Sequence, residues 1–151
     1  MEEIQKVEPT REEMRAKIMH LEEAISNEEG AVFGNDACPL KHTFVDGAYV
    51  REIVNPKGMV ITTKIHKIEH PYFVMKGECI VVTDDSIKRI KAPHWGVTQP
   101  GTKRAIYVLE EMTWITVHVT DSRNLEEIES ELIAESFDEL PEKVKLKLME
   151  E

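Results

Sequence analysis

The sequence predicts a mainly β domain, a small sandwich or closed barrel, with α-helices before and after it. From residue 41 to residue 120, short apolar and β-branched runs recur between turn residues, which is the pattern of antiparallel strands. No helical spacing of apolar residues interrupts these runs, and this disfavours a parallel sheet with alternating helices. On both sides of the region, apolar residues recur at helical spacing instead.

Eight strands are predicted in the central region, most of them separated by Gly, Pro, Asn or Asp. They cover Ala48–Val54, Met59–His66, Tyr72–Lys76, Glu78–Thr83, Ile87–Lys91, Gly96–Gln99, Arg104–Leu109 and Thr113–Thr120. Sequences such as Asp46-Gly47 and Pro100-Gly101 are typical of the turns between strands. A series of short strands with regular turns favours a sandwich or a closed barrel.

A capping box marks the start of the N-terminal helix. Thr10 and Glu13 have the spacing at which each side chain satisfies a free backbone N–H of the first turn. The helix is predicted from Arg11 to Ser26, and its apolar stripe is formed by Met14, Ile18, Leu21 and Ile25. This stripe is expected to pack on the β region or on a second subunit.

The C-terminal segment has a similar signal. Asn124 and Glu127 predict the start of a helix from Leu125 to Glu135, and Pro141 permits one more short helix after it. We therefore expect one structural domain in three parts. These are an N-terminal helix and loop (1–40), the β region (41–120) and a C-terminal helical segment (121–151).

Composition and charge limit the classes of function. The 151 residues carry a net charge of −10, which argues against binding to a nucleic-acid polymer. The acid lies in the flanks, with net charges of −5 over residues 1–30 and −7 over residues 121–151, whereas residues 31–120 carry +2. The sequence shows no secretory signal, no apolar run of membrane-spanning length and only two Cys. We therefore expect a reduced, cytoplasmic protein without a membrane partner.

Strand alternation sorts the polar side chains of the β region by face. If the polar faces line the interior, five basic side chains converge there: Lys64, His66, His70, Arg104 and His118. The alternative is that they lie on the solvent face of an antiparallel sheet. Lys103 has the opposite parity to Arg104 and is expected to face solvent.

The spacing within Gly58–Gly77 resembles the first motif of the cupin superfamily. That motif has a Gly, five residues, His-x-His, three or four residues, Glu, six residues and a Gly. In this sequence Lys64 and His66 stand at the two His positions and His70 stands at the Glu position. The second motif is represented by Pro100-Gly101-Thr102-Lys103-Arg104, which is one residue shorter and has Arg104 at the His position.

The resemblance covers about residues 44–120 and implies a single cupin domain. Its fold would be a double-stranded β-helix, or jelly-roll barrel, flanked by the N- and C-terminal helices, with His66 and His70 pointing into the barrel. The segments CPLKH, KIHKIEH and PGTKR are similar to those of small, mostly uncharacterised cupin proteins that are common in tailed-phage genomes. Cupins host enzymes, storage proteins and sensors, so the fold does not by itself supply a function.

The departures from the motif leave a metal site only in altered form. Metal-binding cupins use three His and one Glu, whereas here His66 is the one matched His and His70 replaces the Glu. His118 would supply a third nitrogen for a divalent Zn, Fe, Ni or Mn ion, but Lys64 and Arg104 would repel a dication. A metal-dependent enzyme of the isomerase, dioxygenase or lyase type, using His66, His70 and His118, is therefore one hypothesis.

The same departures favour an anionic ligand. Arg104 offers a planar fork and Lys64 a point charge, and Tyr72 and Trp114 can stack on a base or sugar ring. The favoured hypothesis is a non-enzymatic protein that binds a small phosphorylated, carboxylated or nucleotide-like molecule. Its expected contacts are Lys64, His66, His70, Tyr72, Arg104, Trp114 and His118. In a phage, such a protein would sequester a nucleotide signal in the host cytoplasm.

A third hypothesis is a virion or scaffold component with an empty barrel. It rests on the segregation of charge into the acidic helices and on the lack of a complete catalytic set. For the oligomeric state, we expect a homodimer, since cupins often pair through their sheets.

Overall fold

Two long antiparallel strands form the centre of the fold. The computed structural model describes residues 7–33 and 38–150. Strands β5 (His70–Val82) and β8 (Ala105–Val119) pair with each other along most of their length. Around them, the seven-stranded sheet has the order β1-β2-β8-β5-β6, with β3 paired to β8 and β7 paired to β5. The shorter strands are β1 (Leu40–Val45), β2 (Ala48–Asn55), β3 (Val60–Thr62), β6 (Ile87–Lys91) and β7 (His94–Thr98).

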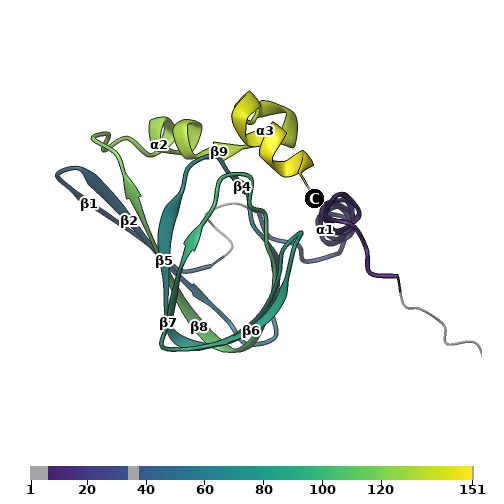
Figure 1. Ribbon diagram of the computed structural model, residues 1–151. Helices are drawn as coiled ribbons and strands as arrows, with labels where there is room; N and C mark the ends of the chain where they lie inside the picture. The colour runs from purple at the N-terminus through teal and green to yellow at the C-terminus, as the bar shows by residue number, and fades with distance from the viewer. Residues whose placement is uncertain (1–6, 34–37, 151) are drawn as a thin grey trace, which may run out of the picture.

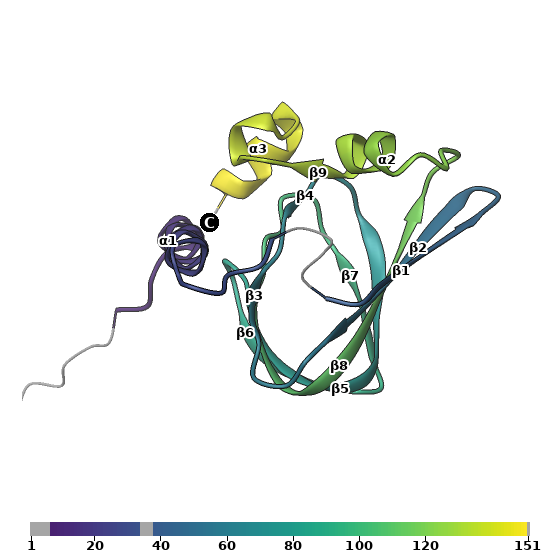
Figure 2. The same ribbon diagram turned by 180° about the vertical axis from the view of Figure 1, so that it is seen from behind.

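The sheet curls because β5 bends in its middle. The pairing of β5 with β8 shifts register between Val74 and Cys79, and Gly77 within this stretch has a φ of +91°. Such irregularities bend a strand and increase its twist. Figures 1 and 2 show the result, in which the sheet closes around an interior and β1 and β2 extend beyond it as a hairpin.

Several predicted strand limits are wrong for the same reason. Tyr72–Lys76 and Glu78–Thr83 belong to the single strand β5, and Arg104–Leu109 and Thr113–Thr120 belong almost entirely to β8. Turn residues within these stretches mark bends inside a strand, because pairing to neighbours on both sides continues past them. Conversely, the predicted strand Met59–His66 is divided into β3 and a separate strand, β4 (Ile65–His66).

The strand β1 was not predicted. It is an edge strand with alternating exposed and half-buried positions, and its apolar content is too low to stand out from the preceding loop. It pairs with β2 through the tight turn at Asp46-Gly47, where Gly47 has a φ of +82°.

In the described residues, three α-helices flank the sheet. Helix α1 (Arg11–Ser26) has the predicted limits, and the side chain of Thr10 accepts a hydrogen bond from the backbone N–H of Glu13. Helix α2 (Leu125–Leu132) begins at the predicted Asn124 cap. It ends before the predicted Glu135 because the next two residues form β9 (Ile133–Ala134), which pairs with β4. A 3₁₀ turn (Phe137–Glu139) leads to α3 (Glu142–Met149).

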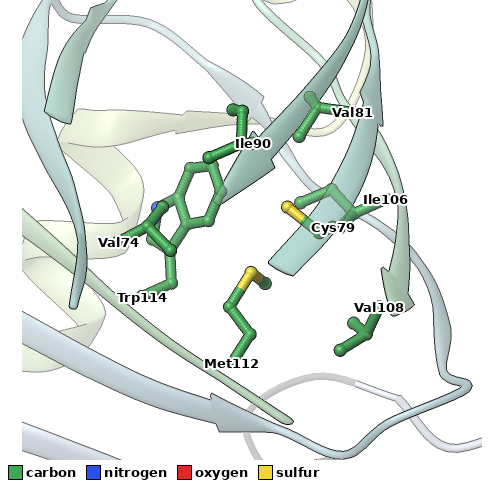
Figure 3. Close-up of a cluster of buried hydrophobic side chains, with 8 residues drawn as sticks. All are labelled: Val74, Cys79, Val81, Ile90, Ile106, Val108, Met112 and Trp114. Carbon is green, nitrogen blue, oxygen red and sulfur yellow. The ribbon is translucent and has the colours of Figure 1, made fainter. Parts of the chain in front are cut away.

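The main hydrophobic core fills the closed end of the barrel. Figure 3 shows side chains from β5, β6 and β8 that point toward one another; they are Val74, Cys79, Val81, Ile90, Ile106, Val108, Met112 and Trp114. Burial of each such side chain contributes about 1.5–3 kcal/mol. Two smaller clusters attach the C-terminal segment. Tyr49 packs with Ile128 and Leu132 of α2, and Ile65 packs with Ala134 and Leu140, next to α3.

Polar contacts fix α1 to the barrel. Arg11 and Arg15 both bind the carboxylate of Asp84, with N–O distances of 3.2 Å and 2.8 Å. Farther along the helix, Glu22 accepts hydrogen bonds from Lys103 at 2.6 Å and from Thr62 at 2.9 Å. The helix therefore lies against the barrel next to the turn between β5 and β6.

Candidate functional site

The basic residue of the second sequence motif lies among aromatic side chains inside the barrel. The guanidinium carbon of Arg104 is 4.9 Å from the ring centroid of Tyr72 and 5.5 Å from that of Trp114. These two rings stack nearly in parallel, with centroids 4.7 Å apart. Nη2 of Arg104 donates a hydrogen bond to Oγ1 of Thr98 at 2.8 Å. Burial lowers the pKa of Arg104, and the cation–π contacts offset part of the cost of burying its charge.

Tyr72 is held in place by the neighbouring strand β7. Its hydroxyl lies 3.1 Å from Nε2 of His94, and Gly96 is its partner in the strand register. A Cβ added at Gly96 would come within 2.7 Å of the Tyr72 hydroxyl oxygen, so the tyrosine needs a glycine at this position. Trp114 is 6% exposed and belongs to the core. Its ring packs on Tyr72, which leaves it no exposed face for a ligand.

Three histidines form a second group of rings, of which His70 and His118 are buried and His66 is half-buried. The ring centroids of His66 and His70 are 4.8 Å apart, and those of His70 and His118 are 4.3 Å apart. Tyr49 continues this series from β2, with its centroid 5.8 Å from that of His118. The predicted convergence of His66, His70 and His118 inside the barrel is therefore present in the structure.

The histidine rings are neutral because they are buried near positive charges. Burial lowers the pKa of His70, and the nearby charge of Arg104 lowers it further. Burial also lowers the pKa of His118, to about 3, with smaller effects from His70 and Arg51. The pKa of His66 is lowered well below its usual range, mainly by burial and then by His70 and Arg104. Imidazole loses its proton in such surroundings because the charged form is poorly solvated.

In the described part of the chain, two buried ring nitrogens of this histidine group have no hydrogen-bond partner. Nδ1 of His70 donates to the carbonyl oxygen of Ile68 at 3.0 Å, so in the neutral ring Nε2 carries a free lone pair. Nε2 of His118 bonds to Oγ1 of Thr116 at 2.9 Å. Within the described part of the chain, His70 Nε2 and His118 Nδ1 are both buried without a hydrogen-bond partner.

These rings do not form a metal centre as they stand. Among residues 7–33 and 38–150, no group of three His, Cys, Asp or Glu side chains is arranged to hold a metal ion. Two guanidinium groups also lie close enough to affect the histidines, those of Arg104 and Arg51. The arrangement of the rings and the two nearby guanidinium cations therefore disfavour a divalent cation at this position.

For two lysines, the exposure of the side chain is the opposite of the sequence prediction. Lys64 does not join the buried group, because its side chain is 55% exposed and pairs with Glu135 at 3.7 Å. It follows the break between β3 and β4, which interrupts the strand alternation on which the prediction rested. Lys103 does not face solvent: its side chain is 5% exposed and binds Glu22 of α1. The prediction was wrong because α1 covers this part of the barrel surface.

A pocket of about 510 Å³ opens beside Arg104. It lies between the inner faces of β5 and β6, the loop that follows β7, and helix α3. Tyr72, Val81 and Ile90 line it on the barrel side, and Val144 and Leu148 line it on the helix side. Of the predicted ligand contacts, Tyr72 and Arg104 line this pocket, whereas the three histidines lie beyond Arg104.

The lining of the pocket is rich in positive charge. Its cationic residues are Arg11, Lys88, Arg104, Lys143 and Lys147, and its acidic residues are Asp84 and Asp85. Asp84 is already paired with Arg11 and Arg15. In the described residues, no ion pair of Lys88, Lys143 or Lys147 is found. A protein with a net charge of −10 thus has a pocket whose lining carries an excess of cations.

Sequence reasoning did not identify the three pocket lysines. Lys88 could have been found from strand alternation, because it shares the inner face of β6 with the buried residue Ile90. Lys143 and Lys147 are four residues apart on α3 and therefore share one face of that helix. No sequence pattern indicated that α3 folds back over the barrel mouth, where Figures 1 and 2 both show it.

Comparison with known proteins identifies the fold. No family model and no curated protein matches the chain. Among solved structures, DMSP lyase DddQ from Ruegeria pomeroyi DSS-3 matches with a TM-score of 0.51 and 15% identity, over 63% of this chain and 54% of that one. A cupin 2 domain-containing protein from Halorhodospira halophila matches with a TM-score of 0.50 and 14% identity, over 64% of this chain and 76% of that one.

A cupin superfamily protein from Desulfitobacterium hafniense DCB-2 also matches, with a TM-score of 0.48 and 13% identity, over 64% of this chain and 87% of that one. At these sequence identities, the likeness to the solved structures concerns architecture alone. The chain has a cupin fold, a mainly β barrel with three flanking α-helices in the described residues.

In residues 7–33 and 38–150, none of the helices has the length and apolar character needed to cross a membrane.

Proposed function

We propose that the protein binds a small anionic molecule without catalysis, in the pocket between the barrel and α3. The observation that carries this proposal is the excess of cations in the pocket lining of a strongly acidic protein. Such a pocket attracts anions, because its walls exclude solvent and concentrate the field of the lysines. A volume of about 510 Å³ lies within the usual range for sites that hold metabolite-sized ligands.

The proposal keeps two of the seven expected contacts, because the other five do not line the pocket. Lys64 is exposed and paired with Glu135, so Lys88, Lys143 and Lys147 take its role as point charges. Arg104 and Tyr72 remain as pocket contacts, and the histidines lie behind them. A phosphorylated or carboxylated molecule fits this set, since lysine ammonium groups donate to either kind of oxygen. Whether such a protein sequesters a nucleotide signal for a phage stays a prediction.

Matched lysine variants test the proposal. Lys88→Met and Lys147→Met together remove two pocket charges, one from β6 and one from α3. Lys91→Met and Lys145→Met remove the same charge from the same elements outside the pocket lining. We expect calorimetry to show saturable binding of inorganic pyrophosphate, about tenfold weaker in the pocket pair and unchanged in the control pair. No saturable binding at millimolar pyrophosphate, or an equal loss in both pairs, would contradict the proposal.

One observation favours the metal-dependent alternative. His70 Nε2 and His118 Nδ1 are buried without hydrogen-bond partners, and such nitrogens are suitable metal donors. Two neighbouring guanidinium groups and the arrangement of the rings argue against it. Elemental analysis of protein purified without a histidine tag decides between the two. A stoichiometric metal that is lost when both His66 and His70 are changed to Ala would favour the enzyme.

A further inference from the structure

The proposed pocket changes in polarity from its inner end to its mouth. Val81 and Ile90 are each 5% exposed and form its inner wall together with Tyr72. Lys88 lies on the same inner face of β6 as Ile90 but two residues nearer the strand end, which corresponds to about 7 Å along a strand. Lys143 and Lys147 are exposed residues of α3. The interior is therefore mostly apolar, and the exposed lysines are at the mouth.

The guanidinium group of Arg104 is in contact with other side chains of the protein. Its Nη2 group bonds to Thr98, and its guanidinium plane is engaged with the rings of Tyr72 and Trp114. It contributes positive potential to the pocket, but part of its hydrogen-bonding capacity is already used by Thr98. A strongly charged group of a ligand is better solvated among the lysines, because complete burial of an anion is costly.

Helix α3 contributes both apolar side chains and lysines to the lining of the pocket. The side of α3 that lines the pocket presents Val144 and Leu148 as well as Lys143 and Lys147. Leu148 also packs closely on Gly101, where an added Cβ would lie 2.9 Å from a Leu148 methyl carbon. Nη2 of Arg15 donates to the carbonyl oxygen of Leu148 at 3.3 Å. The wall that carries two lysines is thus fixed at a set distance from the apolar interior.

We infer that the ligand is an amphiphilic anion, specifically a phosphate monoester whose body contains a ring. The ring would lie against Tyr72, Val81 and Ile90, and the phosphate would lie at the mouth near Lys88, Lys143 and Lys147. This inference rests on the proposed function and narrows its ligand class. Inorganic anions would occupy the mouth alone and leave the apolar wall exposed to water.

Binding of inorganic phosphate and of phenyl phosphate tests the inference of a ring-containing ligand separately from the proposed function of anion binding. We expect calorimetry to show that phenyl phosphate binds at least about tenfold more tightly, since it buries a ring that inorganic phosphate lacks. Equal binding of the two probes would overturn the inference and leave the proposed function standing. If neither probe binds saturably, the proposed function fails together with the inference.

Two valines of similar exposure provide a matched test of the apolar wall. Val97 lines the pocket and is 44% exposed, whereas Val60 lies outside the lining and is 43% exposed. We expect Val97→Asn to weaken phenyl phosphate several-fold and leave inorganic phosphate unchanged, while Val60→Asn changes neither. The Lys88→Met, Lys147→Met pair should weaken both probes by the same factor. A loss of phenyl phosphate binding that is equal in the two valine variants would contradict the inference.

Discussion

Gly77 shows how a single residue shapes the barrel. It has a φ of +91°, and an added Cβ would overlap the carbonyl oxygens of Glu110 and Glu111 and the Cα atom of Met112. This glycine closes the sequence motif that resembles the first cupin motif. Its role is steric, because β8 passes directly over it at the bend of β5.

Alanine at Gly77 should therefore destabilise the protein more than alanine at a glycine of similar conformation. Gly58 has a φ of +85°, but no atom lies within 4 Å of its added Cβ. We expect Gly58→Ala to lower the free energy of unfolding by about 1 kcal/mol, from backbone strain alone. Gly77→Ala should lower it by about 3 kcal/mol or more, because overlap with the backbone is added. Urea unfolding measures both, and equal losses would show that the close approach is unimportant.

The lowered pKa of His118 predicts that the folded protein loses stability in mild acid. Its pKa is about 3 in the folded protein and about 6.5 in an unfolded chain. As the pH falls below about 6.5, the unfolded state takes up the proton first, so stability decreases toward the folded pKa by up to about 1.4 kcal/mol per pH unit. His118→Gln should reduce this pH dependence of urea unfolding relative to the wild-type protein. An unchanged slope in His118→Gln would contradict the assignment.

Parity along continuous strands grouped the inward residues correctly, but it left open which face of each strand is the interior. Trp114, Thr116 and His118 share one face of β8 and are all buried, and His70 and Tyr72 share the inner face of β5. The same reasoning failed at Lys64, where the chain leaves one strand before it enters the next, and at Lys103, where a helix covers the strand end. Alternation gives the two faces of a strand, but other elements decide what covers each face.

At the scale of elements, one of the ion pairs that hold α1 has a buried cation. Lys103 is 5% exposed at its side chain, and Glu22 is its counter-ion at 2.6 Å. Burial alone would raise the pKa of Glu22, but the hydrogen bonds from Lys103 and Thr62 outweigh it and lower the pKa. The carboxylate is therefore charged at neutral pH and stabilises the buried ammonium group.

Removal of Glu22 should loosen α1 from the barrel. Glu22→Ala leaves a buried ammonium group without its partner, which we expect to lower the free energy of unfolding by about 2 kcal/mol. Glu23→Ala on the exposed side of the same helix should change it by less than about 0.5 kcal/mol. Thermal and urea unfolding of the two variants make the comparison. Similar values would show that the pair does not hold the helix.

Local signals predicted the helices better than the sheet connections. The caps at Thr10 and Asn124 act on residues three positions away, so a short stretch of sequence contains all the information. The continuity of β5 and β8 depends on partners from distant parts of the chain. The position of α3 likewise depends on contacts with Ile65 and Gly101, which is why the pocket was not predicted.

At the scale of the molecule, one outer face of the sheet groups the exposed Trp95 with the half-buried Phe73 and Ile115. Trp95, Phe73 and Ile115 occupy neighbouring positions across β7, β5 and β8. Trp95 is 67% exposed and Met75 is 60% exposed. Apolar side chains grouped in this way on a surface are typical of an interface. We propose that this face pairs two copies of the chain, as expected from the sequence.

Light scattering at micromolar concentration tests this proposal. We expect a mass of twice the 17.4 kDa of the chain and a shift to the monomer in Trp95→Asp, because a carboxylate would be buried at the interface. Ile87 on β6 is also strongly exposed, at 70%, but it pairs with Val82, at the other end of β5 from Phe73 and Trp95. Ile87→Asp should remain dimeric. A monomeric wild-type protein would show that the face has another role.

The position of Arg104 between the pocket and the histidines has a consequence for thermodynamic linkage. Its charge lowers the pKa of His66 and His70, so an anion in the pocket would offset part of that effect and raise both pKa values. Each proton bound by these histidines would in turn attract the anion more strongly. Because such coupling is reciprocal, ligand uptake in acid would carry protons with it, and the buried histidines would report the state of a pocket that they do not line.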